Sequence, residues 1–243
     1  MSFSIISISL SQLSLAILVL IATVGNYVAL SPPNRSTKPM PLTGDMVRRL
    51  NLTNQRTTSI GTIPLGFLAL YNAYLICLYP DISPSALRYG AANGLNMDLV
   101  TWSTATFIPL TLILFVGVPL RLVAYSSLGK NFTFELAEPD GLKTTGIYRY
   151  VQHPSYTGIV VLMASDIALL GRLDGAISCW VRPEWYGALQ TLGWALLTPT
   201  WLSLSLFALW TRVQQEERML QAKFGVDWEK WHAKTSRFIP WLF

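Results

Sequence analysis

Long apolar runs with almost no charge constrain this chain more than any other feature. No Asp, Glu, Lys or Arg occurs before Arg35, and only 13% of the 243 residues are charged, against 51% hydrophobic. Soluble domains carry about 25% charged residues. A run of roughly 20 apolar residues crosses the hydrocarbon core of a bilayer, and helices satisfy their own backbone hydrogen bonds there. The sequence therefore predicts an integral membrane protein built from helices.

Five membrane spans are predicted. They cover about residues 3–30, 60–79, 100–122, 156–171 and 187–211. The first run has no basic stretch before it and exceeds the roughly 7–15 apolar residues of a cleaved signal peptide, so we interpret it as a retained span. The expected fold is an all-α, polytopic membrane bundle of about five transmembrane helices. Residues 1–243 are expected to form a single integral membrane domain, with a three-span part (1–125) and a C-terminal part (126–243).

The distribution of Lys and Arg predicts the orientation. The segments 31–59 and 121–155 and the tail from Arg212 together hold 15 Lys and Arg, whereas the segments 80–99 and 172–186 hold three. Basic loops stay on the cytosolic side, so the N-terminus is expected to be lumenal and the C-terminus cytosolic. The net charge of +5 then suits anionic lipid head groups, and does not indicate nucleic acid binding.

Metal chemistry is not expected. The chain has two cysteines and two histidines (Cys77, Cys179, His153 and His232), too few and too scattered for a zinc or iron–sulfur cage.

The first polar segment on the cytosolic side is 140–158. Its first half is rich in Gly and Thr, as loops are, and Pro154 suits the first turn of a helix. The fourth span is therefore expected to open at His153-Pro154, with free backbone N–H groups and a positive dipole end suited to a carboxylate or to hydroxyl groups. The alternative is that Gly146 and Pro154 merely shape a loop.

The second polar segment is 210–225, where the fifth span continues into a polar helix that stops near Gly225. Arg212 and Glu216 are four residues apart and share a helix face. The alternative is a surface ion pair beside an arginine whose head reaches out of the membrane. Beyond it, 228–232 is interpreted as a cytosolic amphipathic helix anchored at head-group level by its tryptophans. Asp166, alone within a span, is assigned no role.

Together the two segments resemble the isoprenylcysteine carboxyl methyltransferase family. The resemblance lies in Gly146-x-Tyr148-Arg149-x-x-x-His153-Pro154-Ser155-Tyr156-x-Gly158, then Arg212, Glu216-Glu217, Phe224-Gly225 and Phe238-Ile239-Pro240. It covers about the last 110 residues. Among the departures, the family often has arginine at the position of Gln152 and proline at that of Ile147.

The resemblance implies a membrane methyltransferase that uses S-adenosylmethionine without a Rossmann domain, with 126–243 as its core. It implies that the cofactor is bound by Asp140, Gly141, Leu142, Lys143, Tyr148, His153, Pro154, Ser155, Tyr156 and Glu216. Arg212 would bind the substrate and act in catalysis. The implied partners are a prenylated protein C-terminus, or a similar prenylcysteine lipid, and membrane lipids; the implied location is the endoplasmic reticulum membrane.

The chemistry of such a reaction needs no general base, because a C-terminal carboxylate with a pKa of about 3.3–3.7 is already ionised. It needs the two reactants held in line and stripped of water, and a cation that orients the carboxylate. The planar fork of Arg212 fits that task better than a lysine does.

Three other functions remain open from the residues alone. A methyltransferase acting on a phospholipid or small lipid would use the same cofactor. An NADPH-dependent sterol reductase would share a His-Pro-x-Tyr-x-Gly element and a pattern like Gly225-Val226-Asp227-Trp228. A non-catalytic membrane scaffold would bind neither cofactor.

Overall fold

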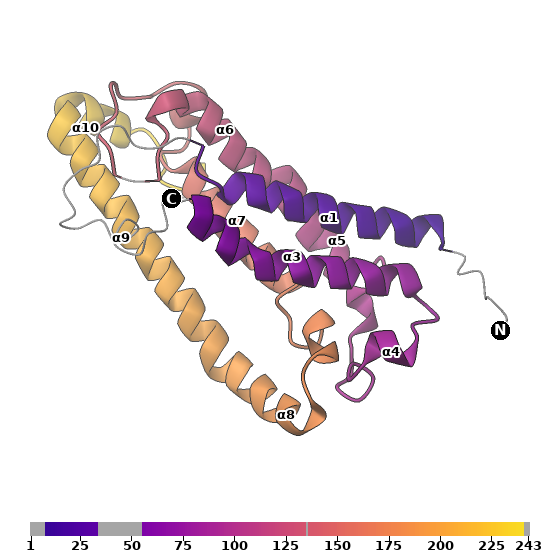
Figure 1. The fold of residues 1–243 in the computed structure, drawn as a ribbon. Helices are drawn as coiled ribbons and strands as arrows, with labels where there is room; N and C mark the ends of the chain where they lie inside the picture. Colours follow the sequence, from indigo (N-terminus) through magenta and orange to yellow (C-terminus); the bar gives the residue numbers. More distant parts are fainter. Residues whose placement is uncertain (1–7, 34–54, 135, 241–243) are drawn as a thin grey trace. The chain divides into compact units, whose positions relative to one another are not determined.

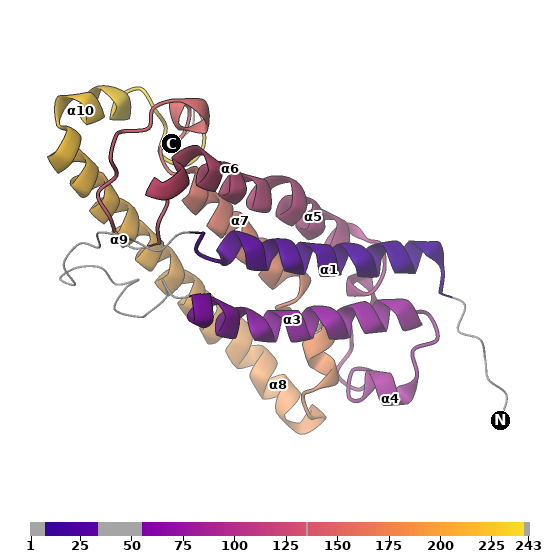
Figure 2. The same ribbon diagram turned by 45° about the horizontal axis from the view of Figure 1, so that its top comes forward.

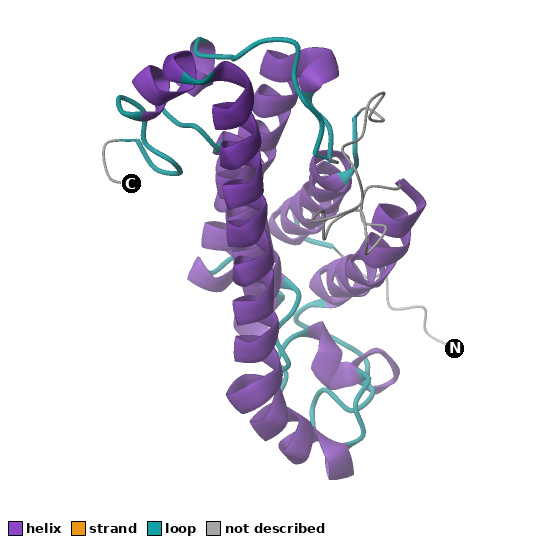
Figure 3. Ribbon diagram, turned by 90° about the vertical axis from the view of Figure 1, so that its left-hand side faces the viewer, coloured by secondary structure: helices purple, strands orange, loops and turns teal. Residues whose placement is uncertain are grey.

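The predicted helical architecture is confirmed. The computed structural model describes residues 8–33, 55–134 and 136–240, and within these ranges Figure 3 shows helices and loops but no strand. The helices are α1 (Leu10–Leu30), α3 (Gln55–Leu78), α4 (Pro84–Leu87), α5 (Thr104–Leu112), α6 (Val118–Leu128), α7 (Pro154–Leu169), α8 (Pro183–Leu192), α9 (Thr198–Phe224) and α10 (Val226–His232).

Apolar helices occur at all five predicted places. Four helical stretches are long and apolar enough to cross a bilayer: Leu10–Leu30, Arg56–Leu78, Met97–Asn131 and Pro183–Phe224. The fourth predicted span is the shorter apolar helix α7. Residues 3–7 of the first predicted span lie outside the described residues. The chain is therefore an all-α, polytopic membrane bundle.

Two spans contain a short π-helical stretch, and each stretch ends just before a proline. Ile113–Gly117 precedes Val118-Pro119, and Gly193–Leu197 precedes Thr198-Pro199. A proline ring clashes with the carbonyl four residues earlier and has no N–H to donate to it. Widening the preceding turn relieves that conflict without ending the helix, so both spans continue past their prolines.

The described residues form two compact units that interleave along the chain. The first holds residues 8–26, 62–115 and 162–199; the second holds 27–33, 55–61, 116–134, 136–161 and 200–240. Within the first unit, α1 and α3 lie side by side and run in opposite directions (Figures 1 and 2). The predicted division into 1–125 and 126–243 stays a prediction.

Two carboxyl groups of the first unit, those of Asp166 and Asp174, have hydrogen-bond partners within the same unit. Asp166 accepts a hydrogen bond from Asn26 Nδ2 at 2.7 Å, which gives this predicted lone carboxyl a partner on α1. In the loops, Arg172 donates to both carboxylate oxygens of Asp174, at 2.8 and 2.6 Å, and Asn96 Nδ2 donates to Asp174 at 3.2 Å. We call Asn96, Arg172 and Asp174 the loop network. The bonds from Arg172 lower the pKa of the Asp174 carboxyl.

Candidate functional site

One face of α9 changes from apolar to charged as the helix approaches its end. Leu209, Arg212, Glu216 and Leu220, spaced three or four residues apart, all line one cavity in the second unit. The helix ends at Phe224, as predicted, because Gly225 adopts a positive φ of 50°, a conformation that favours glycine. The chain then turns back into α10 (Figure 2).

The entrance to α7 is held by the C-terminal tail. The helix begins at Pro154, as the sequence predicts. Just before it, the backbone N–H groups of Gln152 and His153 donate to the carbonyls of Ser236 and Arg237, at 2.8 and 2.9 Å. Thr157 Oγ1 donates to the carbonyl of Phe238 at 2.9 Å. The first turn of α7 is therefore positioned by a segment about 85 residues away in sequence.

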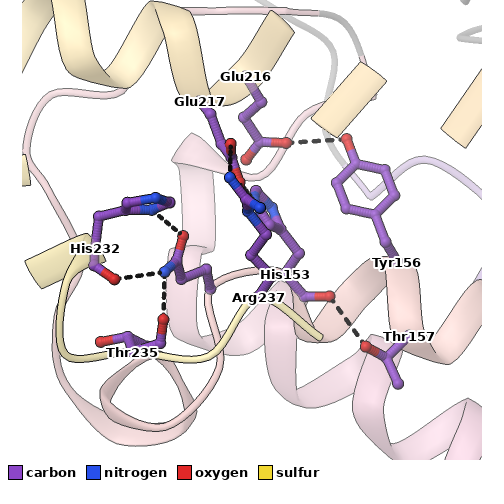
Figure 4. A network of polar contacts seen from close by, with 9 residues as sticks. His153, Tyr156, Thr157, Glu216, Glu217, His232, Thr235 and Arg237 are labelled. Carbon is purple, nitrogen blue, oxygen red and sulfur yellow. Dashed lines mark hydrogen bonds and ion pairs between the residues drawn. The ribbon is translucent and has the colours of Figure 1, made fainter. Parts of the chain in front are cut away.

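The two predicted polar segments meet in that cavity. Tyr156, in the first turn of α7, donates its hydroxyl hydrogen bond to Glu216 Oε2 on α9 at 2.9 Å (Figure 4). The cavity has a volume of about 220 Å³. Of the residues that the resemblance assigned to the cofactor and substrate, it is lined by Gly141, Leu142, Lys143, Tyr148, His153, Pro154, Ser155, Tyr156, Arg212 and Glu216.

Asp140 is the one assigned residue that does not line the cavity. Its carboxylate lies 2.9 Å from Lys130 Nζ, and both side chains are mostly exposed. Its backbone N–H points to Asn131 Oδ1, at 3.4 Å, and Asn131 does line the cavity. Asp140 thus lies beside the site, where a backbone contact remains a prediction.

Arg212 is a buried residue, 6% exposed, and one of its terminal nitrogens donates to the carbonyl of Phe134 at 2.7 Å. The alternative of an exposed surface ion pair with Glu216 does not describe this geometry. Nearby, burial raises the pKa of Tyr148, so its hydroxyl stays protonated at neutral pH and is available as a donor. Arg212 and Tyr148 therefore lie in a largely desolvated part of the cavity.

A second polar network surrounds the entrance to α7 (Figure 4). Glu217 accepts hydrogen bonds from Arg237 at 2.9 and 3.3 Å, and His153 Nε2 lies 3.3 Å from the same carboxylate. Gln152 Nε2 donates to the carbonyls of Thr235 and His232. These contacts join the α7 entrance, α9 and the tail, so adjacent glutamates of α9 have different surroundings.

The short helix α10 forms where predicted, but the interpretation of its tryptophans as head-group anchors is wrong. Trp228 is 6% exposed and its ring stacks on His232, with ring centres 4.3 Å apart. Trp231 Nε1 donates to the carbonyl of Tyr148 at 2.8 Å, and Trp231 lines the cavity. The aromatic face of this helix packs on protein because the folded-back chain offers it a partner surface, which periodicity alone does not reveal.

Arg121 also lines the cavity, although sequence reasoning counted it among the cytosolic loop charges. The structure corrects this: Arg121 is inside α6 and is 3% exposed. A signal was present, because Arg121 stands alone between apolar residues at the end of a predicted span, and an ionisable residue there usually faces the bundle interior.

Comparison with known proteins agrees with the resemblance. Residues 110–179 match the model of a family described as the isoprenylcysteine carboxyl methyltransferase family, and this stretch includes the loop before α7 and the first turns of that helix. No curated protein and no solved structure matches the chain.

Proposed function

Because residues 110–179 belong to the isoprenylcysteine carboxyl methyltransferase family, we propose that this membrane protein methylates the carboxylate of prenylcysteine at the C-terminus of prenylated proteins. In this proposal the methyl donor is S-adenosylmethionine. The reaction takes place at the cytosolic face of the endoplasmic reticulum membrane, with a lumenal N-terminus and a cytosolic C-terminus, as the asymmetry of Lys and Arg indicates.

A single observation carries the proposal: the α7 entrance and the charged end of α9 line the same cavity. The lining groups fit a methyl donor that combines a cationic centre, hydroxyl groups and an amino acid. Glu216 supplies a carboxylate acceptor, Tyr148 a hydroxyl donor, and Lys143 a cation. The loop of 141–143 adds backbone groups, which suit the recognition of a polar cofactor.

The remaining lining suits an apolar acceptor. Leu128, Phe132, Leu136, Ile159, Ala208, Leu209 and Met219 contribute apolar side chains to the same cavity. A prenyl chain buried against them gains about 25 cal/mol for each Å² of apolar surface removed from water. Ala208 and Leu209 belong to a membrane-spanning stretch, so a lipid tail would approach this wall from the bilayer.

The residues of the site would bring the reactants together and exclude water. When bound, S-adenosylmethionine supplies an electrophilic methyl group, which the acceptor carboxylate takes by forming a C–O bond as the C–S bond breaks. No proton moves, because the carboxylate is already ionised. Arg212 orients that carboxylate, while buried Tyr148 and half-buried Tyr156 limit the access of water. Nothing in this scheme requires His153 to act as a base.

The test uses the purified full chain in detergent or nanodiscs. We expect S-adenosylhomocysteine to bind in calorimetry, and labelled methyl groups to appear on N-acetyl-farnesylcysteine as a base-labile ester. A matched acceptor in which the carboxylate is replaced by an amide should accept no label. Binding of NADPH in place of S-adenosylhomocysteine would support a reductase, and binding of neither would support a scaffold; each outcome contradicts the proposal. Label transfer to a phospholipid amine alone would contradict the assigned acceptor.

A further inference from the structure

Arg121 on α6 is a buried cation in the cavity wall to which the proposed function gives no task. Its Nε donates to the carbonyl of Ala29 at 2.8 Å, and its Nη1 donates to Ser155 Oγ. The guanidinium also makes a side-chain hydrogen bond with Tyr125. Ala29 lies in the last turn of α1 and Ser155 in the first turn of α7, so the guanidinium is held between two helix ends.

All of these described partners are neutral. The guanidinium carbon lies 4.8 Å from the ring centre of Tyr125 and 5.2 Å from that of Phe134. Among the described residues, no carboxylate forms an ion pair with Arg121. An arginine stays protonated inside a protein, and a buried charge is costly unless an opposite charge compensates it. Contacts with ring faces compensate only part of that cost, so an anion entering the cavity would be attracted to this group.

The position of Arg121 is set by close packing of α7 on α6. A Cβ atom at Gly158 would lie 2.9 Å from Cγ of Arg121 and 3.1 Å from the carbonyl oxygen of Gly117. Only a residue without a side chain leaves room for the arginine stem there. Gly158 is the glycine of the His153-Pro154-Ser155-Tyr156-x-Gly158 motif, so the structure gives this motif position a physical task.

We propose that Arg121 binds a ligand carboxylate, and that this carboxylate belongs to the amino-acid part of the methyl donor. This assignment rests on the proposed function. Arg121 donates to Ser155, a residue of the segment that we assign to the cofactor, whereas Arg212 is assigned to the acceptor. The donor's amino-acid part carries both a carboxylate and an ammonium group, and the cavity offers both a buried guanidinium and the carboxylate of Glu216.

The experiment measures binding, not turnover, with two probes that differ in one group. Calorimetry on the purified full chain would compare S-adenosylhomocysteine with its analogue that lacks only the carboxylate. For the wild type, removing the carboxylate should weaken binding roughly 10- to 100-fold, the effect of losing a charge-assisted hydrogen bond. In Arg121→Gln, the affinity for S-adenosylhomocysteine should fall by the same roughly 10- to 100-fold. The affinity for the analogue should stay within about threefold of its wild-type value.

Two further variants separate a binding role from a structural one. Gly158→Ala displaces the aliphatic part of the Arg121 side chain without removing its charge. It should lower the affinity for S-adenosylhomocysteine more than the affinity for the analogue. Arg88→Gln is the matched control: Arg88 stacks on Trp180, at 4.1 Å, and does not line the cavity. This control should leave both affinities unchanged. Thermal unfolding of each variant in detergent reports whether the fold persists.

The outcomes are distinguishable. Equal weakening of both probes in Arg121→Gln and in Gly158→Ala would overturn the proposal and leave Arg121 as a structural bridge. Unchanged binding of both probes, with a raised KM for N-acetyl-farnesylcysteine, would also overturn it, because the carboxylate would then be that of the acceptor. If the wild type binds neither probe, the proposed function itself fails.

Discussion

Two arginine sites in this protein are built in opposite ways. In the loop network of the first unit, Arg172 makes a two-pronged contact with Asp174, and Asn96 completes the arrangement. In the second unit, Arg121 is more deeply buried, yet its described hydrogen-bond partners are the carbonyl of Ala29 and the side chains of Ser155 and Tyr125, all neutral. In the first site a carboxylate of the protein neutralises the arginine, whereas in the second site no described carboxylate does so.

The difference indicates what each site does. In a bidentate arginine–carboxylate pair the two charges compensate each other, which leaves little attraction for a third group. A buried arginine with neutral partners retains most of its attraction for an anion. The same contrast appears on a smaller scale on α9, where Glu217 is bonded to Arg237 and His153, while Glu216 faces the cavity. Charges whose bonds are complete should contribute to stability, and charges facing the cavity should contribute to binding and turnover.

Arg212→Lys should have the largest effect. It keeps a positive charge in the cavity but loses the planar fork that orients a carboxylate. We expect turnover of N-acetyl-farnesylcysteine to fall by roughly 100-fold or more, while calorimetry shows S-adenosylhomocysteine affinity within about threefold of the wild type. A variant with near-normal turnover would remove Arg212 from the reaction.

The two glutamates of α9 provide the next test. Glu216→Ala should weaken S-adenosylhomocysteine binding about tenfold, with little change in thermal stability. Glu217→Gln should instead lower the free energy of unfolding by roughly 1–3 kcal/mol, because Arg237 and His153 lose their charged partner. Calorimetry and thermal unfolding on both variants check this split. If Glu216→Ala lowered the stability and Glu217→Gln lowered the affinity, the roles assigned to these two glutamates would be wrong.

Asp174→Asn tests the loop network. Because this ion pair is partly exposed, we expect a loss of about 1 kcal/mol or less in unfolding free energy, and no change in S-adenosylhomocysteine affinity. The pKa of Asp174 is lowered by Arg172, so its stabilising effect is present above the ordinary carboxyl pKa of about 3.9 and lost as the pH falls through the lowered value. The stability difference between wild type and variant should therefore shrink below about pH 4. A large loss of S-adenosylhomocysteine binding in this variant would contradict the assignment of the loop network to stability alone.

The smallest effect is expected at His232. Gln152 Nε2 donates to two carbonyls, so its Oε1 accepts a hydrogen bond from His232 Nδ1 at 2.8 Å. Burial lowers the pKa of His232. The unfolded chain thus binds a proton more readily, and stability should decline as the pH falls from about 6.5 towards the lowered pKa. Thermal unfolding between pH 7.5 and 5.5 (about one unit either side of 6.5) should show a slope for the wild type that His232→Asn reduces. An identical slope in both proteins would contradict this.

Much of the fold could be predicted from local patterns. Pro154 marked the start of α7 and Gly225 the end of α9, because both residues act on the backbone beside them. The spacing of Arg212 and Glu216 correctly placed them on one helix face. The resemblance to the family was recognised from the motif residues, and residues 110–179 match that family's model. The roles assigned to individual site residues stay predictions.

Other features depended on segments far apart in the chain. Trp228 and Trp231 are of a residue type that often anchors helices at a membrane surface, and only the tertiary structure shows that Trp228 is buried and that Trp231 donates to the carbonyl of Tyr148. Arg121 was counted as a loop charge although it lies at the end of a predicted span, and the close packing of α7 on α6 shows how it is buried. The exposure of these residues was predicted wrongly because burial depends on which segments pack against a side chain, and the spacing of residues in the sequence does not specify that packing.

The amino-acid sequence by itself determined that this chain is helical, crosses a membrane several times and carries two polar motifs, because hydropathy, proline and glycine act within a turn or two of their own positions. The tertiary structure alone decided that these motifs share one cavity. It also decided which buried charges are already paired and which arginine is left with neutral partners, because pairing depends on contacts between residues that lie tens of positions apart.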